Sequence, residues 1–203
     1  MALADLRAVL PPPKRPLHPG TPAEWAAAEA ALGLTYPADF KAAIATYGSG
    51  TIGGSIALLN PMDVAWTGAP PFAALPQDLA SLIPTLDPSG PPWQAWLYGA
   101  ASVLASCSGS DRVPLPAPGS PSVPARFWPQ QPGLFPWARG DSGQALLWWT
   151  DGDPARWPVL LADPHEGLLA YPQDTTSLLA GWLAGWLALP YLPPPHGHFA
   201  RPD

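Results

Sequence analysis

Residues 21–50 read TPAEWAAAEAALGLTYPADFKAAIATYGSG, and this stretch decides the first half of the fold. Its opening predicts a helix start. Thr21 supplies a capping hydroxyl, Pro22 suits the first helical position, and Glu24 reaches back to the cap amide. Gly33 is placed to end this helix in a left-handed conformation. We therefore expect a helix over residues 22–32.

A second helix is expected from near Pro37 to the Gly-Ser-Gly break at residues 48–50. Residues at helical spacing define its buried face: Phe40, Ile44 and Tyr47. Residues 51–59 then predict a strand. Asn60-Pro61 ends that strand, and residues 62–66 fit one short helical turn.

The block after Gly133 has the pattern of an antiparallel meander. Segments rich in aliphatic and aromatic residues alternate with short turns built from glycine and aspartate, which is typical of hairpins. The expected strands cover residues 134–138, 144–149, 156–162 and 168–171.

A closing helix is expected to begin near Asp174 or Thr175. Its heavy stripe contains Leu178, Leu179, Trp182, Leu183, Trp186 and Leu187. Its light stripe contains Ala180, Gly181, Ala184, Gly185 and Ala188. A helix that is apolar on all sides is buried, so both stripes are expected in the core. The tail after Pro190 is expected to follow the surface or to fray.

Residues 67–131 differ in character, because proline, glycine, alanine and serine dominate them. A structureless stretch of this length is unusual inside a compact domain, so we interpret it as a proline-rich insertion. Within it we expect a helix around residues 76–83, a further helix or apolar stretch at 93–105, and a flexible loop at 106–124.

The order of these motifs resembles the SUKH superfamily. Trp25 to Lys41 is similar to the family's opening, in which a helix ending in E-x-x-L-G meets L-P-x-D-F. Tyr47 to Pro61 is similar to the glycine end of its second helix and the I-x-L-x-N-P strand that follows. Phe135 to Gly143 resembles its P-x-A-x-x-x-x-G strand and turn, and residues 147–159 resemble its W-x-x-x hairpin. The helix at 177–187 lies where the family places its closing helix.

The resemblance implies one α+β domain over residues 1–203. It has an N-terminal helix pair, a central and mainly antiparallel sheet, and a buried C-terminal helix. Its core covers about residues 20–62 and 133–188, and residues 190–203 form a tail. The long insertion at 67–131 departs from the family pattern by its length.

The superfamily includes bacterial immunity proteins that neutralise polymorphic toxins, many of them nucleases, and a yeast regulator of cell-wall glucan synthesis. It has no generally accepted catalytic residues. The resemblance therefore implies a non-catalytic protein-binding module, with an immunity protein that binds a toxin domain as the first hypothesis. The alternatives are a regulatory scaffold or ligand-binding domain, and a hydrolase that uses Ser142 and His165.

Composition narrows the classes of partner. The 203 residues carry a net charge of −6, which argues against nucleic-acid binding because that function needs a basic surface.

The single cysteine, Cys107, permits no internal disulfide and favours the cytoplasm. The N-terminus lacks a signal-peptide pattern. The most apolar run, residues 178–189, is shorter than the roughly 18 residues that a membrane span requires.

Two patterns invite a catalytic or metal-binding interpretation. Residues 140–143, Gly-Asp-Ser-Gly, resemble a serine-protease nucleophile loop. Such a protease needs a histidine and an aspartate before the serine, and only His18 precedes it among the histidines. His196 and His198 have no third ligand at a supporting spacing. We expect no catalytic, cofactor-binding or metal-binding residue.

The candidate partner contacts are acidic turn residues and one tryptophan. Aspartate is common in turns for conformational reasons alone, but acidic residues in two neighbouring hairpin turns would also form a rim for a basic toxin face. Trp148 and Trp149 are adjacent on one strand and point to opposite faces, so one of them is expected to be exposed to a partner. The predicted partner-binding residues are Asp141, Trp149, Asp151, Asp153, Asp163 and Glu166.

Overall fold

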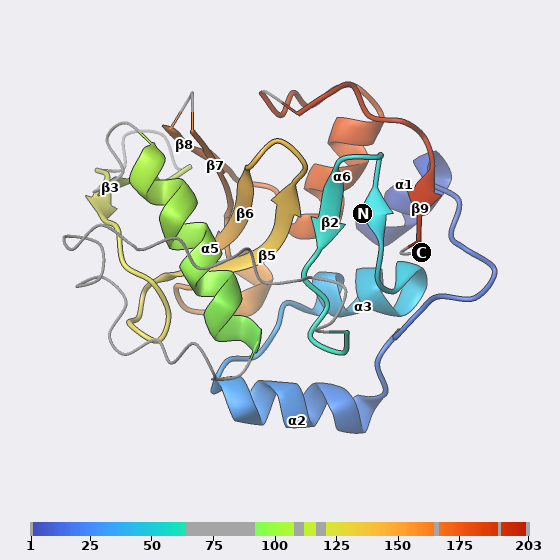
Figure 1. Ribbon diagram of the computed structural model, residues 1–203, viewed down its shortest axis with the longest axis horizontal. Coiled ribbons are helices and arrows are strands. Elements are labelled where there is room, and N and C mark those ends of the chain that lie inside the picture. Colours follow the sequence, from blue (N-terminus) through green and yellow to red (C-terminus); the bar gives the residue numbers. More distant parts are fainter. Residues whose placement is uncertain are drawn as a thin grey trace.

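An antiparallel sheet forms the centre of the molecule (Figure 1). The computed structural model describes residues 2–63, 92–107, 112–116, 121–164, 167–190 and 192–201. The strands of the sheet are β1 (Thr51–Ile52), β2 (Ile56–Leu58), β5 (Leu134–Gly140), β6 (Ala145–Trp149), β7 (Val159–Asp163), β8 (Gly167–Tyr171) and β9 (Phe199–Ala200). In the order β8-β7-β6-β5-β2-β1-β9, every neighbouring pair is antiparallel.

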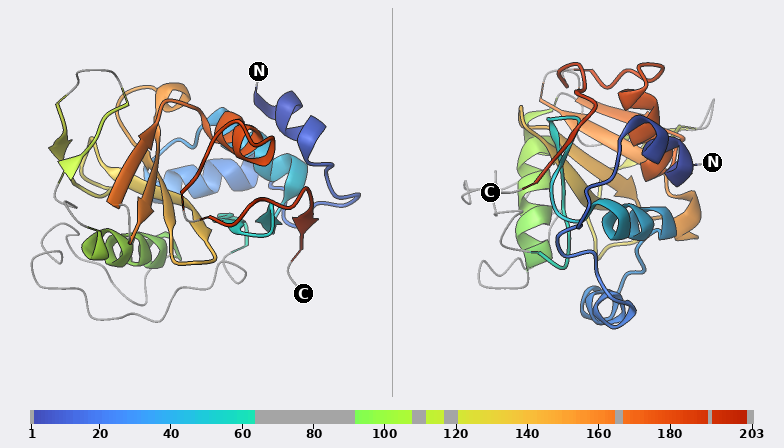
Figure 2. Two further views of the ribbon diagram at one scale, coloured as in Figure 1. Left: turned by 90° about the horizontal axis from the view of Figure 1, so that it is seen from above. Right: turned by 90° about the vertical axis from the view of Figure 1, so that its right-hand side faces the viewer.

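Helices cover both faces of this sheet (Figure 2). On one face α1 (Ala2–Val9), α3 (Ala38–Tyr47) and α6 (Thr175–Leu183) pack together, and on the other face α5 (Pro92–Ser106) packs against β5 to β8. The helix α2 (Pro22–Leu32) lies along the lower end of the sheet in Figure 1, and the short 3-10 helix η1 (Pro154–Arg156) joins β6 to β7. The predicted α+β class is confirmed.

The N-terminal helix pair forms as its sequence predicts. Thr21 Oγ1 accepts a hydrogen bond from the Glu24 N–H at 3.3 Å, and Glu24 Oε2 accepts one from the Thr21 N–H at 2.7 Å. Gly33 ends α2 in the left-handed region with φ of 72°. The last carbonyl of α2 is satisfied from far along the chain, because Trp128 Nε1 donates to the Leu32 carbonyl at 3.2 Å.

The corner between α2 and α3 is held by one half-buried carboxylate. Glu29 Oε1 accepts hydrogen bonds from the Tyr36 N–H at 3.0 Å and from Lys41 Nζ at 2.8 Å. Both partners lie beyond the end of α2, so a single side chain sets the direction in which the chain enters α3. Hydrogen bonds to charged groups are among the stronger ones in proteins.

Aromatic rings fill the space between the sheet and α3. Trp148 on β6 lies at their centre, with its ring centroid 5.0 Å from Phe40 and 6.0 Å from Trp137. Its Nε1 donates to Thr175 Oγ1 at 3.0 Å, which joins the sheet to the first turn of α6. The other rings within contact of Trp148 are Tyr36, Phe135 and Trp157.

The closing helix is shorter than its apolar pattern predicts. It ends at Leu183, because Gly185 takes a left-handed φ of 78° and the N–H groups of Trp186 and Leu187 both turn back to the Gly181 carbonyl at 3.1 Å. Trp186 is therefore 64% exposed, and the prediction that it belongs to the core is wrong.

Both ends of the chain join the fold. The first residues form α1, a helix that the sequence analysis did not identify, and α1 packs on α6. The tail after Pro190 adds the edge strand β9, which pairs with β1. Within the described ranges, none of the helices has both the length and the apolar character that a membrane crossing requires.

The proline-rich region is described in part. The helix or apolar stretch expected at 93–105 is α5. The segment expected as a flexible loop contains a small two-stranded ribbon, β3 (Arg112–Val113) and β4 (Val123–Pro124). The helix expected at 76–83 and most of the turn expected at 62–66 lie outside the described residues.

Asp39 links α3 to the start of α6. Its Oδ2 accepts a hydrogen bond from the Thr176 N–H at 3.1 Å. Burial raises the pKa of Asp39 more than this hydrogen bond lowers it, and the nearby Asp174 carboxylate raises the pKa further. A carboxyl whose pKa is raised by folding favours the folded state while it is protonated. That contribution is lost as the pH rises through the folded-state pKa.

Thr175→Val tests the bond that ties the sheet to α6. Valine has the shape of threonine but cannot accept a hydrogen bond, so the Trp148 N–H would be left buried and unpaired. We expect the free energy of unfolding in urea to fall by about 1–3 kcal/mol. In a Trp148→Phe background the same substitution should cost much less. Equal losses in the two backgrounds would show that this bond does not stabilise the fold.

Asp39→Asn tests the raised pKa. The amide keeps an oxygen for the Thr176 N–H and removes the charge, so the variant should gain free energy of unfolding relative to wild type as the pH rises from about 4 towards neutral. Urea unfolding across this range measures the difference. Asp151→Asn, at an exposed carboxylate, is the control and should show no such trend. A difference between Asp39→Asn and wild type that does not depend on pH would contradict the argument.

Candidate functional site

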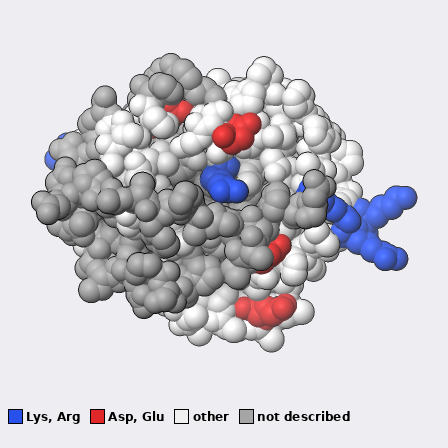
Figure 3. All heavy atoms as spheres, in the orientation of Figure 1, with Lys and Arg blue, Asp and Glu red and all other residues white. Residues whose placement is uncertain are grey.

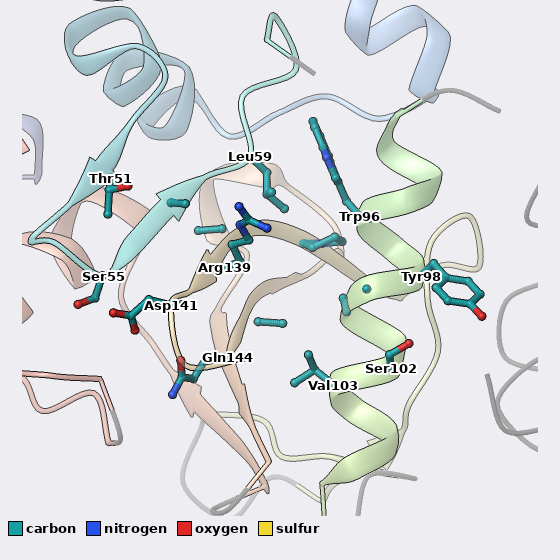
Figure 4. Close-up of a pocket in the computed structure, with 18 of the residues that line it drawn as sticks. Thr51, Ser55, Leu59, Trp96, Tyr98, Ser102, Val103, Arg139, Asp141 and Gln144 are labelled. Atoms are coloured by element: carbon teal, nitrogen blue, oxygen red, sulfur yellow. The ribbon is translucent and has the colours of Figure 1, made fainter. Parts of the chain in front are cut away.

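A cleft of about 700 Å³ lies between α5 and the adjacent face of the sheet (Figure 4). Its floor comes from β1, β2, β5 and β6, and its wall is α5. Its lining includes Thr51, Ser55, Ala57 and Leu59 from β1, β2 and their neighbours, Trp96, Ala100, Ser102, Val103 and Ser106 from α5, and Pro136, Arg139, Asp141, Gln144 and Ala145 from β5, β6 and the turn between them. Tyr98 also borders the cleft, but Figure 4 shows its ring pointing away from it.

One cross-strand row of side chains forms the floor. Thr51 pairs with Ala57, Ala57 with Arg139, and Arg139 with Ala145, so all four lie side by side on the same face of four neighbouring strands. Side chains directly opposite each other on neighbouring strands lie close together. Both neighbours of Arg139 are alanines, whose side chains are too short to reach it, and the space above them is the cleft.

A β-bulge in β5 turns Arg139 into the cleft. Residues two apart in a regular strand point the same way, so Trp137 and Arg139 would normally share a face. The register between β5 and β6 shifts between Pro136 and Ala138, and a bulge of this kind redirects the side chains that follow it. Trp137 therefore enters the aromatic core, whereas Pro136 and Arg139 both line the cleft.

Arg139 is the cation among the described lining residues, and Asp141 is the acid. Figure 4 shows the two side chains pointing apart, Arg139 towards Leu59 and Asp141 towards Ser55. Asp141 Oδ1 accepts a hydrogen bond from Ser142 Oγ at 3.1 Å. The salt bridges found in the described part of the chain, His18–Asp63 and Lys41–Glu29, involve neither residue.

The surroundings of the cleft are mainly uncharged. Figure 3 shows the side of the molecule on which α5 lies, and its described surface carries only scattered charged groups. Of the residues that α5 contributes to the wall, Trp96, Ala100 and Val103 are apolar, and Ser102 and Ser106 are polar. Arg139 itself is exposed, so its charge can be reached from solvent.

A buried polar group lies behind the cleft. Gln144, which is buried on the cleft side, donates from Nε2 to Asp163 Oδ2 at 3.1 Å, and Cys107 Sγ donates to the Asp163 carbonyl at 3.2 Å. Burial raises the pKa of the Cys107 thiol to about 11, and the Asp163 carboxylate adds to this rise. The thiol is therefore protonated at neutral pH and is not a nucleophile.

The described residues of the predicted acidic rim, Asp151, Asp153 and Asp163, do not share one surface. Asp151 and Asp153 are exposed in the β6–β7 turn, where Asp153 Oδ1 caps η1 by accepting from the Ala155 N–H at 3.0 Å. Asp163 lies at the opposite end of β7, because consecutive turns of a meander alternate between the two ends of the sheet. Its exposed fraction is 0%, so it offers no surface to a partner. Glu166 lies outside the described residues.

Trp149, which was predicted to contact a partner, is buried. Trp148 faces the aromatic core, and Trp149 lies on the opposite face of the sheet, on which α5 packs, with 3% of its surface exposed. The expectation that one of the two is exposed is wrong because the sheet is covered on both faces. Of the predicted partner-binding residues, Asp141 alone lines the cleft among those that the structure describes.

The structure describes three of the four side chains that were considered for catalysis or metal binding: Ser142, His196 and His198. Ser142 is exposed in the β5–β6 turn, and His165, its hypothetical base, lies outside the described residues. His196 and His198 stack with ring centroids 5.8 Å apart in the C-terminal tail. Among the described residues, no group of three metal-ligating side chains is brought together.

Arg139 was missed by the sequence analysis. A signal was available, because Arg139 is the single charged residue among 134–140, a stretch otherwise apolar or glycine. Comparisons of the chain with protein-family models, with curated proteins and with solved structures find no match. The interpretation of the cleft therefore rests on its geometry.

Arg139→Gln should leave the stability of the protein unchanged. The side chain is exposed and takes part in neither salt bridge of the described chain, so we expect the free energy of unfolding to change by less than about 0.5 kcal/mol. Trp137→Ala, two positions earlier and on the core face, should cost about 3–5 kcal/mol. Urea unfolding compares the two variants. A loss above about 1 kcal/mol for Arg139→Gln would assign the arginine a structural role.

Proposed function

We propose that this protein is a non-catalytic binding module and that its partner docks at the cleft between α5 and the sheet. The observation that carries the proposal is the placement of Arg139, a cation held in an apolar cleft of about 700 Å³ between two alanines. Concave apolar sites with a few placed polar groups are the usual form of binding sites.

We further propose that the protein belongs to the SUKH superfamily and acts as an immunity protein. The support is an order of elements close to the one that the sequence motifs led us to expect: a capped helix pair, a short hairpin of β1 and β2 where one strand over residues 51–59 was predicted, a meander, and a closing helix. The partner would then be a toxin domain, possible examples being nucleases, and the protein would block it by occupying part of its surface.

We place this activity in the cytoplasm. Cys107 is buried and has a raised pKa, so it is suited to remain a free thiol and has no second cysteine to pair with. A reducing compartment is the usual location for such a chain. The mild acidity of the protein supports a protein partner over a nucleic acid.

A second candidate function is a regulatory domain that binds a small ligand. The size of the cleft favours it, because sites for small molecules typically enclose about 300–1,000 Å³. The two functions use the same surface and differ in what fills it. They are separated by whether a purified macromolecular partner competes for the cleft.

Ala57→Phe tests docking at the cleft. Ala57 is half-buried on the floor beside Arg139, so a phenyl ring there would occupy the space that the partner needs. We expect the affinity for the cognate toxin, sought among the proteins encoded beside this one, to fall about tenfold or more by calorimetric titration. Rescue of growth in cells that express the toxin should be lost in parallel.

The matched control is Ala155→Phe, an exposed alanine on η1 beyond the β6–β7 turn. It should bind the toxin as wild type does, and near-ultraviolet circular dichroism should show both variants folded. Equal binding by both variants would place the contact elsewhere on the molecule. Failure of the wild type to bind any toxin encoded beside it would overturn the immunity proposal.

A further inference from the structure

We infer that the cleft recognises an extended, apolar segment of the partner that carries one carboxylate, and that this carboxylate binds Arg139. The inference rests on the proposed function and specifies its chemistry. It reverses the sign of the contact that the acidic turns suggested, since the receiving group is a cation.

The positive charge among the described lining residues comes from Arg139. A guanidinium presents a planar fork of donors that matches a carboxylate, with two parallel N–H···O bonds. Ala57 and Ala145 flank Arg139 on the neighbouring strands and leave that fork uncovered on the floor. The one acid among the described lining residues, Asp141, is turned towards Ser55 and accepts a hydrogen bond from Ser142 (Figure 4).

Apart from the polar side chains of Thr51, Ser55, Ser102, Ser106 and Gln144, the remainder of the cleft suits aliphatic side chains. Ala100 and Val103 on α5 line the cleft, as do Pro136 on β5 and Ala145 on β6. These residues offer apolar surface without groups that need a hydrogen-bond partner. A ligand that places an apolar side chain here and an anion at Arg139 satisfies both parts of the site.

The length of the wall favours an extended segment. The cleft borders α5 from Trp96 to Ser106, and the ten steps between these residues, at about 1.5 Å each, give a wall of about 15 Å. An extended chain advances about 3.3 Å per residue, so this wall matches about four or five residues. A segment of that length carries the two or three side chains that the floor and the wall can receive.

The first experiment tests the chemistry of the cleft with two fluorescent probes of similar shape. Anilinonaphthalene sulfonate has an aromatic body and an anionic group, and phenylnaphthylamine has a similar body without the anion. We expect Arg139→Gln to weaken binding of the sulfonate probe about tenfold or more. Binding of the neutral probe should stay within about twofold of wild type. Arg156→Gln, an exposed arginine on η1, is the charge-matched control and should change neither probe.

The second experiment tests the source of the anion with a pair of labelled peptides, acetyl-Ala-Leu-Leu-Asp-Leu amide and the same peptide with asparagine in place of aspartate. We expect fluorescence anisotropy to show the aspartate peptide binding more tightly than the asparagine peptide, and the difference to vanish in Arg139→Gln. Arg139-dependent binding of the sulfonate probe with no binding of either peptide would overturn the segment as occupant and favour a small amphipathic anion.

Two further outcomes separate this inference from the proposed function. If the toxin binds wild type and Arg139→Gln equally, the inference fails and the binding module stands. If no toxin binds but the probes and peptides discriminate as expected, the recognition chemistry stands and the immunity role fails. Equal binding of both probes to wild type and Arg139→Gln would overturn the role of the arginine.

Discussion

The indole of Trp148 is the contact on which the arrangement of the layers depends. It packs edge-on against Phe40 of α3, stacks with Trp137 of β5, and donates its N–H to Thr175 at the start of α6. Helices from both halves of the chain are thereby held against one strand. Aromatic rings supply large buried area with restricted geometry, so this cluster fixes position as well as stabilising the fold.

The packing of the aromatic core also affects which side chains of β5 lie on the opposite face of the sheet. β5 must direct both Phe135 and Trp137 into the core, and the bulge after Pro136 then reverses the alternation. Arg139 falls on the face away from the core, which a charged side chain can occupy without burial. The position of the cation in the cleft is thus linked to the packing of Trp137, although the two side chains point in opposite directions.

What the sequence predicts well is local. The capping box of α2 and its glycine end depend on residues three or four positions apart, so Thr21, Glu24 and Gly33 were sufficient to place the helix. The face of the sheet that holds Trp149 is covered by α5, a helix some 50 positions earlier in the chain, and period-two alternation does not show whether both faces are covered. The end of α6 was missed because an apolar stripe continues through Gly185, whereas the backbone does not.

In the candidate site, too, the local features were predicted and those that depend on distant parts of the chain were not. Hairpin turns were placed correctly, and Asp141 at one of them borders the cleft. The neighbouring turns were assumed to share a surface, but a meander sends successive turns to opposite ends of the sheet, so Asp153 and Asp163 cannot form one rim. Arg139 was overlooked because its direction depends on a bulge. A bulge is defined by the pairing of two strands, so the sequence pattern of β5 alone does not reveal it.

The floor of the cleft is built from small residues, in contrast to the other face of the same sheet. The chain has 11 tryptophans and fills the other face of the sheet with rings, so large side chains are not scarce. Each buried methylene contributes about 0.8 kcal/mol, and leucines in place of Ala57 and Ala145 would have packed the floor against α5. Instead the floor is formed by two alanines with an arginine between them. A helix packed on a sheet for stability alone needs neither feature, whereas an occupant with an apolar body and an anionic group needs both.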